Sequence, residues 1–276
     1  MSTFAYLGPA GTFTEAALHG ITDQSDSLVP YANVTAALNA VRDGLAEFAL
    51  VPIENSVEGV VARTLDELAT GDLLEIVAET TLPVSFALMV LPENVDNEIR
   101  RIATHPHAES QCRVYISREF PESEIIPTPS TAAAAEGLKD GNWDAAIAAK
   151  VAAEKFGLTV IAENIGDSDY AVTRFVLVRK PGTVPTPTGF DRTSLVAYID
   201  IDHAGALLEI LTEFANNQVN LSFIQSRPSG RELGHYRFII DVEGHQEDTA
   251  VRKSIVGLRG ICDDIRVLGS YPRDRK

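Results

Sequence analysis

The stretch Gly166-Asp-Ser-Asp-Tyr-Ala-Val-Thr-Arg-Phe-Val-Leu-Val-Arg-Lys180 places a hydroxyl and a guanidinium at the start of an apolar strand. Residues 175–178 form a short apolar run, which is typical of a buried strand. Thr173 and Arg174 therefore stand where a loop enters a sheet, a place where α/β proteins commonly bind ligands. Arg174 can hold a planar carboxylate through two parallel hydrogen bonds or can brace the fold, and the pattern leaves both roles open.

The composition is that of an ordinary globular protein with a strongly acidic balance. Of 276 residues, 45% are apolar and 22% charged, with 23 Lys and Arg against 39 Asp and Glu and a formal net charge of −16. This length suits two or three compact units. The acidic balance argues against nucleic acid as a partner, and an anionic ligand must be held locally by arginine side chains and helix N-termini.

Cysteine content and hydropathy predict a location inside the cell. The sequence has two cysteines, Cys112 and Cys262, which we place in different domains, so a reducing compartment is indicated and no disulfide framework is expected. No basic segment with an apolar core opens the chain, and no apolar run reaches membrane-spanning length. We therefore expect a cytoplasmic protein without a membrane partner.

Units of strand, polar turn and helix recur along the first part of the chain. A strand at 4–7 leads into a helix from Thr14, and Ser130 and Thr131 precede an alanine-rich helix in the same way. This repetition predicts mostly parallel sheets covered by helices. Two lobes joined by crossing strands would leave a cleft, which is the usual place for a small ligand.

A proline-rich segment, residues 181–191, forms an extended linker and divides the chain. The residues after it follow the β-α-β-β-α-β order of a ferredoxin-like domain, with strands expected at 193–200, 219–225, 235–242 and 265–268 and helices at 205–216 and 247–258. The predicted domains are 1–180, with one lobe at about 1–73 plus 163–180 and another at about 74–162, then the linker, then 192–276.

Two further turns place polar groups near expected strand ends. Gly8-Pro-Ala-Gly-Thr12 joins a strand to a helix, and its N–H groups suit a carboxylate or phosphate, although an ordinary β–α turn is the alternative. Glu54-Asn-Ser56 ends a buried strand, and apolar residues from Val57 to Leu68 predict a helix directly after it, with Asn55 or Ser56 as its N-cap.

Five motifs, taken in order, resemble a known family. They are Tyr6-Leu-Gly-Pro-Ala-Gly-Thr-Phe-Thr14, Val51-Pro-Ile-Glu-Asn-Ser56, Thr173-Arg-Phe175, Gly205-Ala-Leu-Leu208 and Ser226-Arg-Pro228. Each motif alone is weak, but the ordered set resembles prephenate dehydratase with a C-terminal ACT regulatory domain over residues 3–273. The resemblance implies a two-lobed catalytic domain like a periplasmic binding protein, followed by a ferredoxin-like ACT domain.

The resemblance implies a hydro-lyase of phenylalanine biosynthesis. Such an enzyme converts prephenate to phenylpyruvate with loss of carbon dioxide and water, needs no metal or organic cofactor, and is regulated allosterically by phenylalanine. Aromatisation drives the reaction, so the protein has to fix a dianion, assist the departing hydroxide and desolvate the leaving carboxylate. An effector site between subunits implies a homodimer or homotetramer.

The resemblance also assigns roles to residues. The catalytic candidates are Thr173, as donor to the leaving hydroxyl, Glu54, as an acid if burial raises its pKa, and Asn55, as an orienting group. Substrate-binding candidates are Arg174, Phe175, Ser56, Gly8, Pro9, Gly11, Thr12, Thr104 and Gln111. Effector-binding candidates are His203, Gly205, Ala206, Leu207, Leu208, Asn220, Gln225, Ser226, Arg227 and Pro228.

Two positions depart from the family pattern. Thr104 stands where a serine is frequent and keeps the hydroxyl, whereas Gln225 replaces a usual glutamate and removes a negative charge from the expected effector site. His105, His107 and Cys112 suggest a metal site, but the histidines lie two residues apart across Pro106 without a further ligand cluster, so no metal is expected.

Other functions stay open on the sequence. Arogenate dehydratase, which acts on the amino analogue of prephenate, is not separated from prephenate dehydratase, and whether phenylalanine inhibits or activates is not decided. Two alternatives come from other classes. They are a non-catalytic two-lobed small-molecule binding protein with an amino-acid sensor domain, and an ACT protein whose lobes bind a partner.

Overall fold

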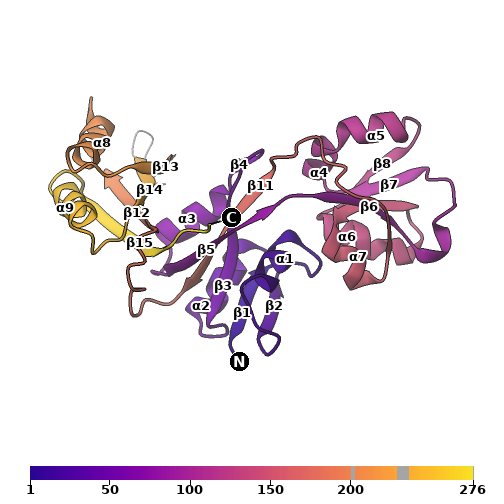
Figure 1. Ribbon diagram of the computed structural model, residues 1–276, viewed down its shortest axis with the longest axis horizontal. Coiled ribbons are helices and arrows are strands. Elements are labelled where there is room, and N and C mark those ends of the chain that lie inside the picture. The colour runs from indigo at the N-terminus through magenta and orange to yellow at the C-terminus, as the bar shows by residue number, and fades with distance from the viewer. Residues whose placement is uncertain (200–202, 229–235, 276) are drawn as a thin grey trace. The chain divides into compact units, whose positions relative to one another are not determined.

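The structure is a computed structural model that describes residues 1–199, 203–228 and 236–275 (Figure 1). Helices and strands alternate along the chain, which confirms the predicted α/β class. The described residues form three sheets, of six, five and four strands.

The six-stranded sheet holds the stretch that contains Thr173. Its elements are β1 (Thr3–Leu7), α1 (Phe13–His19), β2 (Ser27–Tyr31), α2 (Val34–Arg42), β3 (Phe48–Asn55), β4 (Gly59–Val60), α3 (Ala62–Thr70), β5 (Glu75–Pro83) and β11 (Val172–Arg179). The strand order is β2-β1-β3-β11-β5, with β4 paired to β3. As predicted, β11 returns to the N-terminal part of the chain, where it lies between β3 and β5.

The five-stranded sheet has the order β10-β6-β9-β7-β8. Its elements are β6 (Phe86–Val90), β7 (Arg101–Thr104), α4 (Pro106–Gln111), α5 (Arg113–Glu119), β8 (Glu124–Pro127), α6 (Thr131–Glu136), β9 (Ala145–Ala149), α7 (Lys150–Phe156) and β10 (Thr159–Ala162), with 3-10 turns at Pro92–Asn94 and Gly137–Asp140. β7 pairs in parallel with β8 and β9, whereas β6 pairs antiparallel with β9 and β10. The sheet is therefore mixed, because β6 runs against β9 and β10 while β7, β8 and β9 share one direction.

The segment after Ser56 differs from the prediction. The structure has a hairpin there, in which Glu54 pairs with Val60 and Asn55 with Gly59, and helix α3 begins only at Ala62. Gly59 has a φ of +85°, a left-handed conformation that glycine adopts without strain. The prediction that Asn55 or Ser56 caps a helix is therefore wrong, since the chain first folds back on β3.

The four-stranded sheet confirms the ferredoxin-like order of the C-terminal part. Its elements are β12 (Asp191–Ile199), α8 (Ala206–Asn216), β13 (Leu221–Pro228), β14 (Tyr236–Glu243), α9 (Thr249–Leu258) and β15 (Asp264–Pro272). The strand order is β13-β14-β12-β15, and the three pairs are antiparallel. Asp200 and His235, which were predicted to belong to strands, lie outside the described residues.

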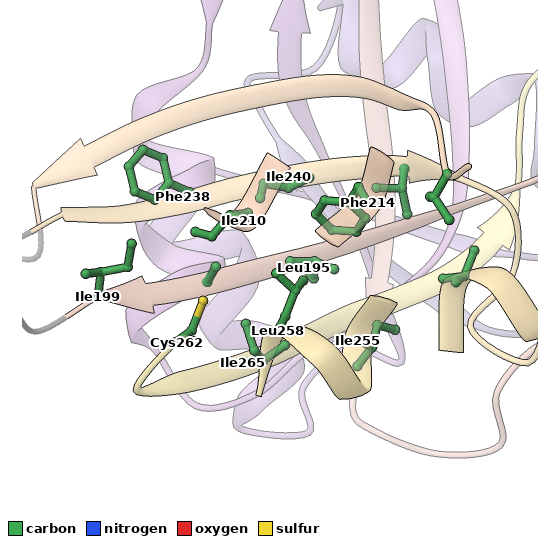
Figure 2. Close-up of a cluster of buried hydrophobic side chains, with 14 of the residues drawn as sticks. Leu195, Ile199, Ile210, Phe214, Phe238, Ile240, Ile255, Leu258, Cys262 and Ile265 are labelled. Carbon is green, nitrogen blue, oxygen red and sulfur yellow. The ribbon is translucent and has the colours of Figure 1, made fainter. Parts of the chain in front are cut away.

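A single apolar cluster holds this sheet to its two helices (Figure 2). Leu195 of β12 and Ile240 of β14 are fully buried, and they pack with Phe214 of α8 and Leu258 of α9. Burying each such side chain contributes roughly 1.5–3 kcal/mol relative to exposure, so the cluster stabilises this layer without any disulfide.

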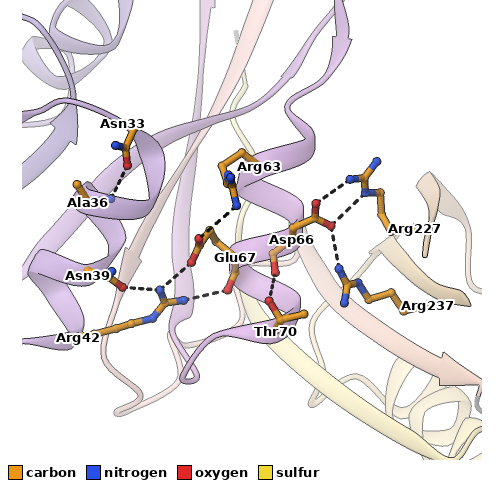
Figure 3. A network of polar contacts seen from close by, with 10 residues as sticks. All are labelled: Asn33, Ala36, Asn39, Arg42, Arg63, Asp66, Glu67, Thr70, Arg227 and Arg237. Atoms are coloured by element: carbon orange, nitrogen blue, oxygen red, sulfur yellow. Dashed lines mark hydrogen bonds and ion pairs between the residues drawn. The ribbon is translucent and has the colours of Figure 1, made fainter. Parts of the chain in front are cut away.

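The described chain divides into two compact units. The first comprises Met1–Ala37, Leu50–Val60 and Thr81–Phe175, and the second Leu38–Ala49, Val61–Thr80 and Val176–Lys276. Within the second unit, α3 contacts the four-stranded sheet through Asp66, whose carboxylate accepts hydrogen bonds from Arg227 of β13 and Arg237 of β14 (Figure 3). The domain boundaries given above stay a prediction.

Both cysteines, Cys112 and Cys262, are buried free thiols. Burial raises the pKa of Cys112 to about 12 and that of Cys262 to about 11, so neither is an activated thiolate at neutral pH. No helix among residues 1–199, 203–228 and 236–275 has the length and apolar character needed to cross a membrane.

Candidate active site

A cavity of about 540 Å³ opens in the first compact unit. This volume suits a small molecule, and the wall combines apolar side chains with a few polar groups. Residues from both the six-stranded and the five-stranded sheet and from their loops contribute, namely Leu7, Gly8, Pro9, Thr12, Phe13, Thr14, Ala32, Pro52, Asn55, Glu58, Val84, Phe86, His105, His107, Ala108, Gln111, Pro129, Ser130, Thr131, Ala133, Thr173 and Phe175.

Asn55 and Thr173 form a hydrogen-bonded pair in this wall. Asn55 ends β3, Thr173 lies at the start of β11, and the two strands are neighbours in the sheet. The amide oxygen of Asn55 accepts hydrogen bonds from the Val57 and Glu58 N–H groups, both at 2.8 Å, so its Nδ2 must face the other way. Nδ2 donates to Thr173 Oγ1 at 2.8 Å, which leaves the hydroxyl proton of Thr173 for another acceptor.

Arg174 and Glu54 form an ion pair beside this hydrogen bond. The Arg174 side chain is buried, and its Nε donates to Glu54 Oε2 at 3.2 Å. Neither side chain lines the cavity. The geometry favours the bracing role that the sequence left open for Arg174, because the guanidinium balances the charge of Glu54.

Ser56 and Thr104 hold the backbone together. The Ser56 hydroxyl donates to the Tyr170 carbonyl at 3.1 Å and accepts from the Val172 N–H at 2.9 Å, which joins the end of β3 to the start of β11. Thr104 is fully buried and donates to the Ile147 carbonyl at 2.8 Å. Both lie outside the cavity wall, so their expected contact with a ligand stays a prediction that the geometry does not favour.

The turn before α1 is organised by a buried carboxylate. Glu15 accepts hydrogen bonds from the Gly11 N–H, from Tyr6 Oη at 3.2 Å and from Lys155 Nζ at 3.2 Å. Burial acts to raise the pKa of Glu15, but the Gly11 and Lys155 hydrogen bonds outweigh it and hold the pKa below its usual value. The Gly11 N–H is thus engaged by the protein itself, whereas Gly8 and Thr12 line the cavity, where their ligand-binding role stays a prediction.

A polar cluster around Glu58, a residue that the sequence analysis did not single out, also lines the cavity. Glu58, in the β3–β4 hairpin, accepts a hydrogen bond from Gln111 Nε2 at 2.9 Å, and its other oxygen lies 3.6 Å from His107 Nδ1. His105 caps α4 by accepting from the His107 N–H. Burial lowers the pKa of His105, and the neighbouring His107 adds to this effect while Glu58 opposes it.

No three His, Cys, Asp or Glu side chains gather as a metal site among the described residues. Gln111 and Phe175 line the cavity, and their substrate-binding roles stay predictions. Glu58 gave no signal in the sequence, because the expected helix after Ser56 would have directed it elsewhere. A glycine four residues after the end of β3, here Gly59, is the one sequence feature that could have indicated a hairpin.

The predicted effector residues lie in two segments of the C-terminal domain. Gly205 has a φ of +100° and caps α8, and a side chain built there would meet no atom within 4 Å, so the position is open. Next to it are Ala206, Leu207 and Leu208, and His203 Nε2 lies 3.1 Å from Glu209. The other segment, β13, carries Gln225, Ser226, Arg227 and Pro228, and Asn220 precedes it.

Two family models match the chain. The prephenate dehydratase model matches residues 4–183, and the ACT domain model matches residues 194–260. The chain belongs to the prephenate dehydratase family. The prephenate dehydratase of Amycolatopsis methanolica is 45% identical over 274 residues, which is 99% of this chain and 89% of that protein.

Solved structures agree with membership of the prephenate dehydratase family. A prephenate dehydratase from Arthrobacter aurescens, solved in complex with L-Phe, superimposes with a TM-score of 0.93 at 48% identity over 98% of this chain and 90% of that one. A protein described as GqqA, a novel type of quorum quenching acylase, superimposes with a TM-score of 0.87 at 29% identity over 99% of this chain and 98% of that one. The fold and the C-terminal ACT domain are thus those of the family.

Proposed function

We propose that this chain is a prephenate dehydratase that forms phenylpyruvate, carbon dioxide and water from prephenate. The observation that carries the proposal is the 2.8 Å hydrogen bond from Asn55 Nδ2 to Thr173 Oγ1 in the cavity wall. It directs the Thr173 hydroxyl as a donor into a cavity of about 540 Å³, and 45% identity to a prephenate dehydratase supports the choice of substrate.

The reaction requires help for a departing hydroxide. The C–C bond to the ring carboxylate breaks, its electron pair enters the ring, and the C–O bond of the ring hydroxyl breaks as carbon dioxide forms. The hydroxide takes one proton from solvent, so the prephenate dianion and a proton give phenylpyruvate monoanion, carbon dioxide and water. Thr173 donates a hydrogen bond to that oxygen as charge develops, because a threonine hydroxyl is too weak an acid to give its proton away.

The walls of the cavity suit an aromatising ring. Phe175 is nearly fully buried and lines the cavity together with Phe13 and Phe86, whose rings meet edge to face at 5.5 Å. Such apolar walls remove water from the carboxylate that leaves, which destabilises its charge relative to carbon dioxide. Gln111 contributes an amide for a carboxylate or keto oxygen of the substrate.

We also propose that phenylalanine binds at the turn of Gly205 and at the β13 segment of Gln225 and regulates the enzyme. The L-Phe complex of the Arthrobacter aurescens protein supports this effector. Arg227 has a structural role in this arrangement, because its guanidinium donates two hydrogen bonds to Asp66 of α3, at 3.1 and 2.7 Å (Figure 3). Since α3 directly follows the hairpin of Glu54 and Asn55 in the chain, this ion pair offers a route from effector to catalysis.

We further propose a homodimer or homotetramer in the cytoplasm. Exposed apolar side chains on the C-terminal domain, Leu208 and Ile224, support association through that domain. The two buried free thiols, Cys112 and Cys262, agree with a reducing compartment. Size-exclusion chromatography with light scattering tests the assembly, and a monomer with and without phenylalanine contradicts it.

The acylase among the similar structures is not a second candidate. Acyl transfer by a hydroxyl requires a base within hydrogen-bond reach of the nucleophile. Among the described residues of the cavity wall, no hydrogen bond joins a Ser or Thr hydroxyl to His105 or His107, and the Thr173 hydroxyl instead meets the amide of Asn55. The geometry therefore supports hydrogen-bond donation more than nucleophilic attack.

The deciding experiment compares turnover of prephenate and arogenate by the purified protein. Phenylpyruvate is detected by its ultraviolet absorbance and phenylalanine, the product from arogenate, by chromatography. A higher kcat/KM for prephenate supports the proposal, a higher value for arogenate indicates arogenate dehydratase, and no product from either substrate indicates a binding protein.

A further inference from the structure

Glu58 places a carboxylate in the wall of the cavity that we propose for a dianionic substrate. Among the described residues that line the cavity, Glu58 is the single Asp or Glu, and no Lys or Arg is present to balance it. The basic side chains in the wall are the imidazoles of His105 and His107. A fixed negative charge at this place opposes a doubly negative ligand, so its position needs an explanation.

The contacts of Glu58 are those of a bound carboxylate. One oxygen accepts a hydrogen bond of 2.9 Å from the Gln111 amide, and the other lies 3.6 Å from His107 Nδ1. An amide donor and an imidazole, spaced for the two oxygens of one carboxylate, form a small carboxylate-binding pair. Both His107 and Gln111 belong to helix α4, so this helix presents the two donors together.

The Glu58 side chain can leave this pair without breaking the hairpin. The Glu58 N–H is anchored to Asn55 Oδ1 at 2.8 Å, and Glu54 pairs with Val60 across the hairpin, so the backbone stays in place when the side chain rotates. The side chain is 34% exposed, which gives its carboxylate a path to solvent. Rotation of the side chain therefore frees the Gln111 amide and the His107 imidazole for a ligand.

We propose that Glu58 is an internal carboxylate that occupies the place of the side-chain carboxylate of the substrate, the one that phenylpyruvate retains, and that substrate displaces it from Gln111 and His107. The inference rests on the proposed function, since it assumes a carboxylate ligand in this cavity. It gives two residues a role in substrate binding. Glu58 competes with the substrate carboxylate, and His107 binds that carboxylate together with Gln111. Competition between Glu58 and the substrate carboxylate weakens substrate binding and therefore raises KM. It does not involve the bonds that react, so kcat is little affected.

The test is the substitution Glu58→Gln, which removes the charge and keeps the size and one oxygen acceptor for Gln111. We expect KM for prephenate, and the Kd for phenylpyruvate measured by calorimetry, to fall about fivefold, as for a partly exposed charge interaction. We expect kcat to stay within about twofold. The variant His107→Ala should raise KM by a similar factor, because one of the two carboxylate donors is lost.

Glu109→Gln is the matched control, since Glu109 lies on α4, the helix of His107 and Gln111, and outside the cavity wall. Glu109→Gln should leave KM and Kd unchanged. Equal Kd values for the unmodified protein and Glu58→Gln overturn the inference while leaving the proposed function intact. If the unmodified protein neither converts prephenate nor binds phenylpyruvate, the proposed function and the inference both fail. The melting temperature of each variant verifies that it is folded.

Discussion

Asn55 Nδ2 donates a hydrogen bond of 2.8 Å to Thr173 Oγ1, across 118 positions of sequence. The direction of this bond is set by the backbone N–H groups of Val57 and Glu58, which occupy the amide oxygen of Asn55. A hydroxyl that receives a hydrogen bond becomes a better donor to a third group. The pair therefore occupies an acceptor position of the Thr173 hydroxyl and leaves its proton for another acceptor at the cavity wall.

The first prediction concerns the Thr173 hydroxyl. Thr173→Val keeps the shape of the side chain and removes its donor, so kcat should fall by about 100-fold or more, as when one transition-state donor is removed. Thr173→Ser retains the hydroxyl and should keep kcat within about tenfold. Steady-state kinetics with prephenate measure both variants, and a Thr173→Val enzyme with near-normal kcat removes Thr173 from the mechanism.

The second prediction reverses the hydrogen bond at Asn55. In Asn55→Asp a carboxylate replaces the amide donor, so the Thr173 hydroxyl turns its proton towards the new carboxylate and away from the substrate, while the Val57 and Glu58 N–H groups keep their acceptor. We expect kcat to fall by about 100-fold with little change in melting temperature. A variant that is fully active would show that the direction of this bond has no role in catalysis.

Part of this site was predictable from the sequence. Short polar turns at the ends of apolar runs located Thr173, Asn55 and the turn at Gly8, and the alanine-rich helix expected after Ser130 is α6, Thr131–Glu136. These features depend on local pattern, in which capping residues, glycines and apolar spacing act within a few positions.

The rest depends on contacts between distant residues. Glu58 and Gln111 are 53 positions apart, and Asp66 and Arg227 are 161 positions apart. An apolar spacing from Val57 to Leu68 looked like one helix, but Gly59 lets the chain turn back to pair with β3. Hairpin pairing of β4 with β3 thus overrode the helical preference of this segment.

The third prediction concerns the ion pairs of α3. Asp66→Asn removes the carboxylate that pairs with the guanidinium of Arg237, whose side chain is 7% exposed. Because Asp66 itself is 30% exposed, we expect a loss of about 1–2 kcal/mol rather than the larger cost of breaking a fully buried pair. Urea unfolding measures this loss. Arg63→Gln, which removes a surface pair of 4.0 Å on the same helix, is the control and should change little.

The fourth prediction is the pH dependence of that loss. The hydrogen bonds from Arg227 lower the pKa of Asp66 below its usual value, burial opposes them, and Arg237 adds to the lowering. A carboxyl whose pKa is lower in the folded state stabilises the fold fully above its unfolded pKa, and this contribution is lost as the pH falls through the folded pKa. The difference in unfolding free energy between the unmodified protein and Asp66→Asn should therefore be full at pH 7 and shrink below about pH 4. A difference that is the same at pH 3 and pH 7 contradicts this assignment.

The fifth prediction concerns the effector. Phenylalanine at millimolar concentration should raise the melting temperature, because a ligand that binds the folded state stabilises it. Gln225→Glu restores a negative charge beside the expected ammonium group and should enlarge the shift. Gln24→Glu makes the same change of charge on an exposed residue of the N-terminal part and should not. Absence of any shift in the unmodified protein shows that no effector site is present.

The most direct test of the account is the rate at which the purified protein forms phenylpyruvate from prephenate at neutral pH, compared with the Thr173→Val variant under the same conditions. We predict ultraviolet absorbance of phenylpyruvate well above the spontaneous decay of prephenate for the unmodified protein, and a rate near that decay for the variant. Equal rates for the two proteins, or no product above decay from either, would contradict the account.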